Sequence, residues 1–168
     1  MVVVSSTAQN IGKIDFDDLN WERRSYRAWL AYGQSKLANM LFALELQRRL
    51  TTAGSKVEVT AAHPGWTATD LQRTALLVRV LNPVFAMKPA DGALPTLRAA
   101  TDPQAPPASY WGPSRFLEMN GPPAPARVAP RARDEAVAAK LFDLSESLTG
   151  VSFPKRAKPA AAEAAAAH

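Results

Sequence analysis

A tyrosine and a lysine four residues apart, Tyr32 and Lys36, are the side chains of this sequence best suited to acid–base chemistry. They fall near the start of residues 31–50, where apolar residues recur at spacings of three and four, a pattern that predicts an amphipathic helix. Residues four apart project from the same side of a helix. An ammonium group beside a phenol favours the phenolate, which makes a tyrosine usable as an acid or base near neutral pH. The same spacing also suits an ordinary surface pair, so the interpretation depends on the neighbouring motifs.

Two serines directly follow the first predicted strand. Residues 2–4 are three consecutive valines, a run typical of a strand covered on both faces, and Ser5 and Ser6 come next. Parallel α/β sheets bind their ligands at the carboxyl ends of the strands. The serines are therefore candidates for a ligand site, although hydroxyls that simply cap a strand end would look the same.

A proline–glycine pair ends the second predicted strand. Val57, Val59 and Ala61 form the apolar alternation of this strand, and Pro64–Gly65 closes it. Thr67 and Thr69 then fall at a predicted helix N-terminus, where free backbone amides can bind an anion or a carboxamide. An ordinary capping arrangement is the alternative. The tyrosine–lysine pair, the serines and this turn are all expected at one edge of one sheet.

The order of the remaining elements indicates an α/β fold. Strands are predicted at 2–4, 57–61 and 109–111, and helices at 31–50, 67–80, 90–100 and 133–148. Alternating strands and helices imply right-handed crossovers and a parallel sheet. The proline-rich residues 121–130 are predicted to be a loop. We expect one partial domain over 1–153 and a disordered Ala/Lys/Pro-rich tail over 154–168.

Composition narrows the classes of function. The chain has 168 residues, 47% of them hydrophobic and 21% charged, which predicts a folded domain with a buried core. It has no cysteine, which excludes disulfides and thiolate chemistry and fits a reducing compartment. The net charge of +5 is scattered in small groups, so we predict a solvated surface and no nucleic-acid partner.

No membrane or metal site is expected from the sequence. The most apolar stretch, 74–87, is interrupted by polar residues and is too short to span a bilayer, so we predict no stable membrane insertion. The N-terminus has neither the basic region nor the apolar core of a signal peptide, and a cytoplasmic location is expected. The acidic group at 15–18 lacks the spacing of a calcium loop, and we predict no metal.

Three segments taken together resemble a known family. They are Val-Val-Val-Ser-Ser at 2–6, Tyr-Gly-Gln-Ser-Lys-Leu-Ala-Asn at 32–39 and His-Pro-Gly-Trp-Thr-Ala-Thr at 63–69. They resemble the second half of short-chain dehydrogenases/reductases, and the segments 14–20 and 147–151 are similar to the retinol dehydrogenase-like branch. The resemblance implies the C-terminal part of a doubly wound, Rossmann-like parallel sheet, here three strands with flanking helices, beginning in the fifth of seven strands.

The resemblance also implies roles for individual residues. Ser6 would orient the substrate oxygen, Tyr32 would donate or accept the proton, and Lys36 would hold the nicotinamide ribose and favour the phenolate of Tyr32. The residues expected at the nicotinamide end of the cofactor are Tyr32, Lys36, Pro64, Gly65, Thr67 and Thr69. The implied cofactor is NAD or NADP, and the implied reaction interconverts an alcohol and a carbonyl on an apolar small molecule.

The family's glycine-rich phosphate loop has no counterpart in this sequence. The alternative hypothesis is therefore a truncated, non-catalytic fragment or an interaction module that lacks the dinucleotide-binding half. A basic surface-binding protein is a further rival. If strand 2–4 lacks its neighbour in the sheet, we expect its exposed edge to favour self-association.

Overall fold

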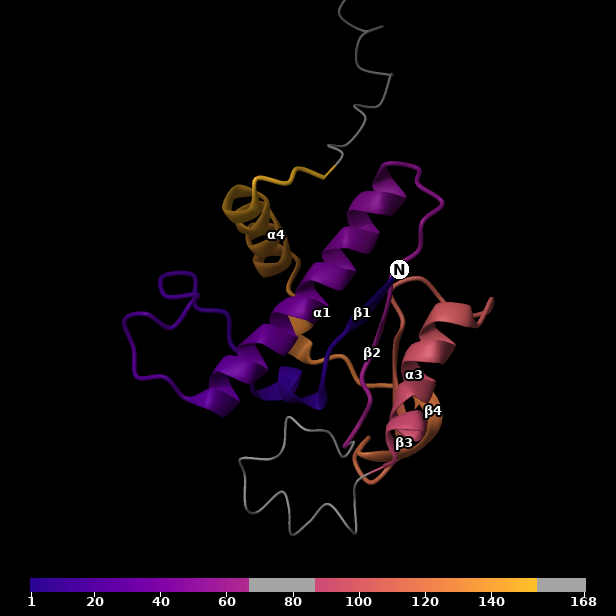
Figure 1. Ribbon diagram of the computed structural model, residues 1–168. Coiled ribbons are helices and arrows are strands. Elements are labelled where there is room, and N and C mark those ends of the chain that lie inside the picture. The colour runs from indigo at the N-terminus through magenta and orange to yellow at the C-terminus, as the bar shows by residue number, and fades with distance from the viewer. Residues whose placement is uncertain (67–86, 154–168) are drawn as a thin grey trace, which may run out of the picture.

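The computed structural model describes residues 1–66 and 87–153, and its elements are arranged as Figure 1 shows. In chain order they are β1 (Val2–Val4), the 3-10 helix η1 (Thr7–Ile11), α1 (Ala28–Thr52), β2 (Thr60–Ala62), α3 (Pro89–Thr101), β3 (Tyr110–Arg115), β4 (Asn120–Pro125), the 3-10 helix η3 (Pro130–Arg133) and α4 (Glu135–Thr149). The predicted helix at 67–80 and the predicted tail at 154–168 lie outside the described residues.

One mixed sheet has the strand order β1-β2-β3-β4. The first three strands are parallel: β1 pairs with β2, with Val2 opposite Thr60, and β2 pairs with β3, with Ala61 opposite Tyr110. Strand β4 runs antiparallel to β3. The predicted α/β class is confirmed. The strand count was wrong, because β4 lies within the proline-rich segment that the sequence assigns to a loop. Proline is tolerated in such a strand because β4 lies at an edge of the sheet, where a missing N–H breaks no ladder.

The two faces of the sheet are covered by different helices. Val3, Ala61 and Tyr110 pack with α1 and α4, while the alternate residues Val2, Ala62 and Trp111 pack on the side of α3. This alternation follows from the two-residue period of a strand. Figure 1 shows the strands between α1 and α3.

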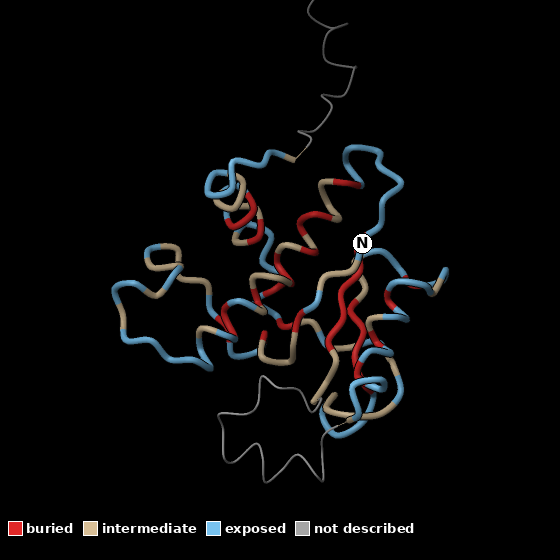
Figure 2. The backbone as a smooth tube through the Cα atoms, in the orientation of Figure 1, coloured by how far each residue is buried: buried red, intermediate tan, exposed pale blue. Residues whose placement is uncertain are grey.

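Helix α1 holds the largest part of the core. Its fully buried residues include Leu37, Met40 and Leu41, at the spacings that predicted the helix, and Leu46, whereas Leu44 of the same pattern is only partly buried. Helix α4 packs against it through stacked rings of Phe42 and Phe142, whose centroids are 5.3 Å apart. In Figure 2 the buried parts of α1 and α4 lie on the sides where these helices meet each other and the sheet.

Two strand boundaries differ from the prediction. Strand β2 begins at Thr60, and Val57, which the sequence places in the strand, is exposed. Strand β3 continues through Gly112 and Pro113, where the sequence predicts its end. Pairing between β2 and β3 stops at Trp111, so β3 is paired only with β4 from there on, and Pro113 costs no hydrogen bond on the β2 side.

Candidate active site

The carboxyl end of β1 is bonded to one turn of α1. The buried Ser5 hydroxyl donates a hydrogen bond to the carbonyl of Lys36 at 2.8 Å. The side-chain amide of Asn39 donates to the carbonyl of Val4 at 2.9 Å. These two bonds fix the helical turn that carries Lys36 against the end of the strand.

The segment that follows Ser6 packs against the preceding turn of α1. Ser6 caps η1, because its hydroxyl accepts the N–H of Ala8 at 3.2 Å. Beyond η1, Gly12 lies so close to Gly33 that a Cβ on Gly12 would collide with the carbonyl of Gly33. Because Gly33 directly follows Tyr32, this close approach brings the Ser6 segment to the part of the helix that carries Tyr32.

Tyr32 and Lys36 lie together on the surface of α1. The Lys36 Nζ atom is 5.4 Å from the centroid of the Tyr32 ring. Tyr32 is 41% exposed and Lys36 is half-buried, so a phenol accessible to a ligand has a cation beside it. The ring of Trp29 meets that of Tyr32 edge-on, with centroids 6.3 Å apart. This arrangement can move a proton at the Tyr32 oxygen.

The Pro64–Gly65 loop follows β2 at the same end of the sheet. Gly65 has a φ of +68°, a backbone conformation that favours glycine. The N–H of the next residue, Trp66, donates to the carbonyl of Met119 at 2.8 Å. Of the residues predicted at the nicotinamide end, Tyr32, Lys36, Pro64 and Gly65 are described, and Thr67 and Thr69 lie outside the described residues.

A buried histidine beside this loop was not assigned a chemical role from the sequence. His63, 1% exposed, has its Nε2 atom 3.2 Å from Glu118 Oε2, and its Nδ1 atom accepts the N–H of Gly65 at 3.2 Å. Burial lowers the pKa of His63, and Glu118 opposes this shift. Burial likewise raises the pKa of the nearby Tyr110 hydroxyl. No spacing in the sequence links residues 63, 110 and 118, so only the fold could reveal this cluster.

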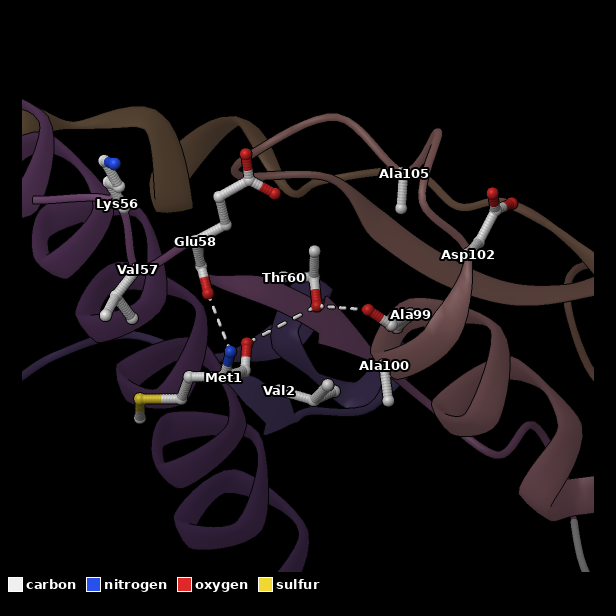
Figure 3. Close-up of a pocket in the computed structure, with 10 residues that line it drawn as sticks. All are labelled: Met1, Val2, Lys56, Val57, Glu58, Thr60, Ala99, Ala100, Asp102 and Ala105. Atoms are coloured by element: carbon white, nitrogen blue, oxygen red, sulfur yellow. Dashed lines mark hydrogen bonds between the residues drawn. The ribbon is translucent and has the colours of Figure 1, made fainter.

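A pocket at the opposite end of the sheet does not coincide with the predicted site. Figure 3 shows it at the amino ends of β1 and β2, where the Met1 ammonium donates to the Glu58 carbonyl and the Thr60 hydroxyl to that of Ala99. None of the predicted site residues that the structure describes lines it. Because ligands of parallel α/β sheets bind at the carboxyl ends of strands, this pocket is a poor candidate for the active site.

The acidic segment at 15–18 is occupied by internal contacts. Asp18 accepts the backbone N–H groups of Glu22, Arg23 and Arg24, which lower the pKa of its carboxyl group, and Asp15 is paired with the Arg24 side chain. Over residues 1–66 and 87–153 there is no group of three acidic or histidine side chains that could hold a metal. Within the same residues no helix combines the length and apolarity that crossing a bilayer requires.

The donor set at the carboxyl ends of the strands fits one end of a nicotinamide dinucleotide. An exposed phenol, a half-buried ammonium and a glycine-containing loop suit the nicotinamide and its ribose. No glycine-rich loop for the pyrophosphate occurs in the sequence. Among the described residues, the donor set at this edge of the sheet therefore fits the nicotinamide end of such a cofactor.

Comparisons with known proteins identify relatives of the chain. No family model matches the chain. Retinol dehydrogenase 14 of Homo sapiens is 38% identical over 160 residues, covering 90% of this chain and 44% of that protein. Retinol dehydrogenase 13 of Homo sapiens is 37% identical over 163 residues, covering 92% and 46%. A crystal structure of an uncharacterized protein from Mycobacterium paratuberculosis has a TM-score of 0.73 at 44% identity, over 91% of this chain and 51% of that one.

The fold and these relatives define the class: the chain is a homologue of the short-chain dehydrogenases/reductases. Within that family it matches the retinol dehydrogenases, at 35–38% identity along about nine-tenths of its length. The chain spans less than half the length of these curated relatives.

Proposed function

We propose that this chain carries the proton-transfer site of an NAD(P)-dependent oxidoreductase that interconverts an alcohol and a carbonyl on an apolar substrate. The observation that carries the proposal is the Lys36 ammonium beside the exposed Tyr32 ring, on a helical turn bonded to the end of β1. The names of the relatives, which include retinol, support an apolar alcohol as the substrate. The absence of cysteine supports a cytoplasmic location.

Each residue has a distinct part in the proposed reaction. In the oxidative direction the Tyr32 oxygen takes the hydroxyl proton of the alcohol, and in the reductive direction it returns a proton to the carbonyl oxygen. Lys36 stabilises the phenolate by its positive charge. The Ser6 hydroxyl donates a hydrogen bond to the substrate oxygen and so orients it. When bound, the nicotinamide ring accepts or supplies the hydride.

Lys36 is proposed to serve the cofactor as well, through hydrogen bonds from its ammonium to the nicotinamide ribose. Pro64 and Gly65 would line the nicotinamide, with Thr67 and Thr69 following them. The position of the Pro64–Gly65 loop at the carboxyl end of β2 supports this assignment.

Cofactor binding and turnover test the proposal separately. NADH and NADPH are titrated calorimetrically into the chain. Turnover of apolar alcohols is measured with the chain alone and with a chimera in which the chain replaces the matching part of a full-length retinol dehydrogenase. Lys36→Ala should weaken cofactor binding and lower turnover, because the ammonium serves both. Lys56→Ala, at the opposite end of the sheet, is the matched control. Equal effects of the two lysine substitutions would refute the assignment of Lys36.

A second candidate, an interaction module, is favoured by the free edge of the sheet. Strand β1 has no neighbour on one side among the described strands, and Val4 is 44% exposed. The Met1 carbonyl and the Ser5 N–H point toward β2, so the backbone of Val2 and Val4 faces the open side, where Asn39 bonds the Val4 carbonyl. Such an edge can pair with a strand of another chain.

The two candidates differ in what the isolated chain should do. An interaction module should bind NADH and NADPH weakly or not at all, because the sequence has no glycine-rich loop for the pyrophosphate, and it should associate through β1. Size-exclusion chromatography with light scattering measures the second property. A monomer that binds either cofactor at about micromolar affinity would reject the interaction module and identify a self-sufficient enzyme.

A further inference from the structure

The turn between β3 and β4 has an unusual backbone. Phe116, Leu117 and Glu118 have φ angles of +48°, +55° and +64° in succession. Residues other than glycine rarely adopt this left-handed conformation, and three in a row persist only where surrounding contacts require it. The contacts of the turn therefore indicate why this backbone conformation is maintained.

The turn supports the loop that follows β2. Glu118 is held by the N–H of Arg127, which donates to its Oε1 at 2.9 Å, while its Oε2 lies 3.2 Å from His63 Nε2. The next residue, Met119, accepts the N–H of Trp66 through its carbonyl. The turn thus reaches the 63–66 segment through one side chain and one backbone group.

The hydrogen bonds define the tautomer of His63. Its Nδ1 accepts the N–H of Gly65, so that nitrogen carries no proton. The proton of the neutral ring is then on Nε2, which donates to Glu118. A single ring connects the Glu118 carboxylate to the backbone of Gly65.

The ring of His63 has little room to move. A Cβ on Gly112 would collide with Nε2, so glycine at this position lets the ring sit against β3. On another side the ring of Tyr110 lies at a centroid distance of 5.2 Å. Packing on both sides holds the ring in the orientation that both hydrogen bonds need.

We propose that His63 and Glu118 are a positioning pair that sets the backbone conformation of the Pro64–Trp66 loop. The inference rests on the proposed function, which assigns this loop to the nicotinamide end of the cofactor. Both side chains act through the Gly65 N–H, and Glu118 acts through His63.

The pair makes the loop dependent on protonation. Adding a proton to Nδ1 removes the acceptor for Gly65. The groups that face the ring are the Glu118 carboxylate, from the β3–β4 turn, and the Tyr110 phenol, from β3. The carboxylate favours the charged ring, while burial disfavours it.

Nuclear magnetic resonance of the ¹⁵N-labelled full chain tests the pair directly. In the wild type the ring nitrogens should report the Nε2–H tautomer, and the Gly65 amide shift should change with pH along the same curve as the His63 ring. Glu118→Gln should move that curve to lower pH, because the charged ring loses its counterion. This variant removes a charge from a partly exposed side chain and leaves the buried ring in place.

Two substitutions of His63 separate its two nitrogens. Asparagine keeps an acceptor near the position of Nδ1, and glutamine keeps a donor near the position of Nε2. His63→Gln should weaken NADH or NADPH binding roughly threefold to tenfold, the worth of one hydrogen bond, whereas His63→Asn should change it less than about twofold. In His63→Asn the chemical shift of the Gly65 amide should no longer change over the pH range in which the His63 ring of the wild type titrates.

A Gly65 amide that ignores the titration of His63, or an Nδ1–H tautomer, would overturn the positioning role. So would equal cofactor affinities in the asparagine and glutamine variants when both are folded. If the wild-type chain binds neither cofactor, the proposed function loses support, and the Gly65 titration still decides whether the pair positions the loop.

Discussion

Tyr32 and Lys36 stand on a helix of 25 residues that an extensive apolar cluster holds to the sheet, whereas Pro64 and Gly65 lie in a loop bonded to the His63 ring, which in turn contacts Glu118. An apolar cluster distributes its contribution over many side chains. A loop that depends on single hydrogen bonds loses its geometry when one partner is removed. The helical side of the proposed site should therefore tolerate chemical changes without losing its shape, and the loop side should be sensitive to single substitutions.

The largest effect should come from removing one oxygen on the helical side. Tyr32→Phe should lower turnover by about 10²- to 10⁴-fold, because it removes the proposed proton carrier, while the free energy of unfolding changes by less than about 0.5 kcal/mol. Steady-state kinetics and urea unfolding measure the two quantities. Tyr26→Phe, at a tyrosine that is 70% exposed, is the control. A near-normal kcat in Tyr32→Phe across the pH range would show that Tyr32 is not the acid–base group.

Deleting a core side chain of the same helix should have the opposite signature. Leu41 is fully buried, and Leu41→Ala should lower the free energy of unfolding by about 2 to 5 kcal/mol through lost burial and the cavity left behind. Leu148→Ala, at a residue of α4 that is 65% exposed, should change it by less than about 0.5 kcal/mol. Urea unfolding of both variants measures these changes. Equal losses in the free energy of unfolding would mean that the apolar cluster does not hold α1.

On the loop side, adding one methyl group should suffice to disturb the structure. Gly112→Ala places a Cβ against His63 and should cost about 1 to 3 kcal/mol of stability. Combining it with His63→Ala should cost less than the sum of the two single changes, since the shortened side chain leaves room for the methyl group. Additive losses in this double-mutant cycle would show that contact with the His63 ring is not the reason why a larger residue is unfavourable at position 112.

The two serines after β1 should separate stability from chemistry. Ser5→Ala leaves the Lys36 carbonyl without its hydroxyl donor in a buried place and should cost about 1 to 2 kcal/mol of stability. Ser6→Ala should instead act mainly on turnover, because Ser6 is half-buried and is proposed to orient the substrate. Urea unfolding and kinetics on both variants check this division, and the reverse pattern would exchange their roles.

The smallest effect should appear in the pH dependence of stability. Because burial lowers the pKa of His63 below its ordinary value of about 6.5, the unfolded chain binds a proton at pH values where the folded chain does not. Stability should therefore fall as the pH drops from about 7.5 through 6.5 toward the folded pKa. His63→Asn should flatten this part of the curve, measured by urea unfolding at about pH 7.5 and 5.5. An unchanged slope would contradict the lowered pKa.

The elements with strong local patterns were predictable. The apolar spacing of α1 and the valine run of β1 gave both elements within a few residues, because burial of one face imposes the pattern directly. The position of Tyr32 and Lys36 on one side of α1 was predictable from the same helical pattern. Residues 120–125 carry three prolines and were assigned to a loop, since their strand conformation depends on an edge position that only the complete sheet reveals.

The supports of the site could not be read from the sequence. The partners His63 and Glu118 are 55 residues apart. The left-handed turn that brings Glu118 to the ring contains no glycine from which the sequence could have predicted it. The bond from Ser5 to Lys36 also joins distant segments, although both motifs were expected at one edge of the sheet. Spacing locates side chains within one element, whereas contacts between elements depend on how the chain is packed.

The bonds between β1 and α1 have a consequence for synthesis on the ribosome. They join residues 31 and 35 positions apart, whereas the first bond between β1 and the β2 segment spans 57. At about 5 to 20 residues per second, α1 becomes available to the nascent β1 roughly one to five seconds before β2 does. The free fragment 1–54 should already show Asn39 bonded to Val4, and the absence of this bond would contradict the order. On this order of events the helix holds the valine strand in place until its partner strand has been made.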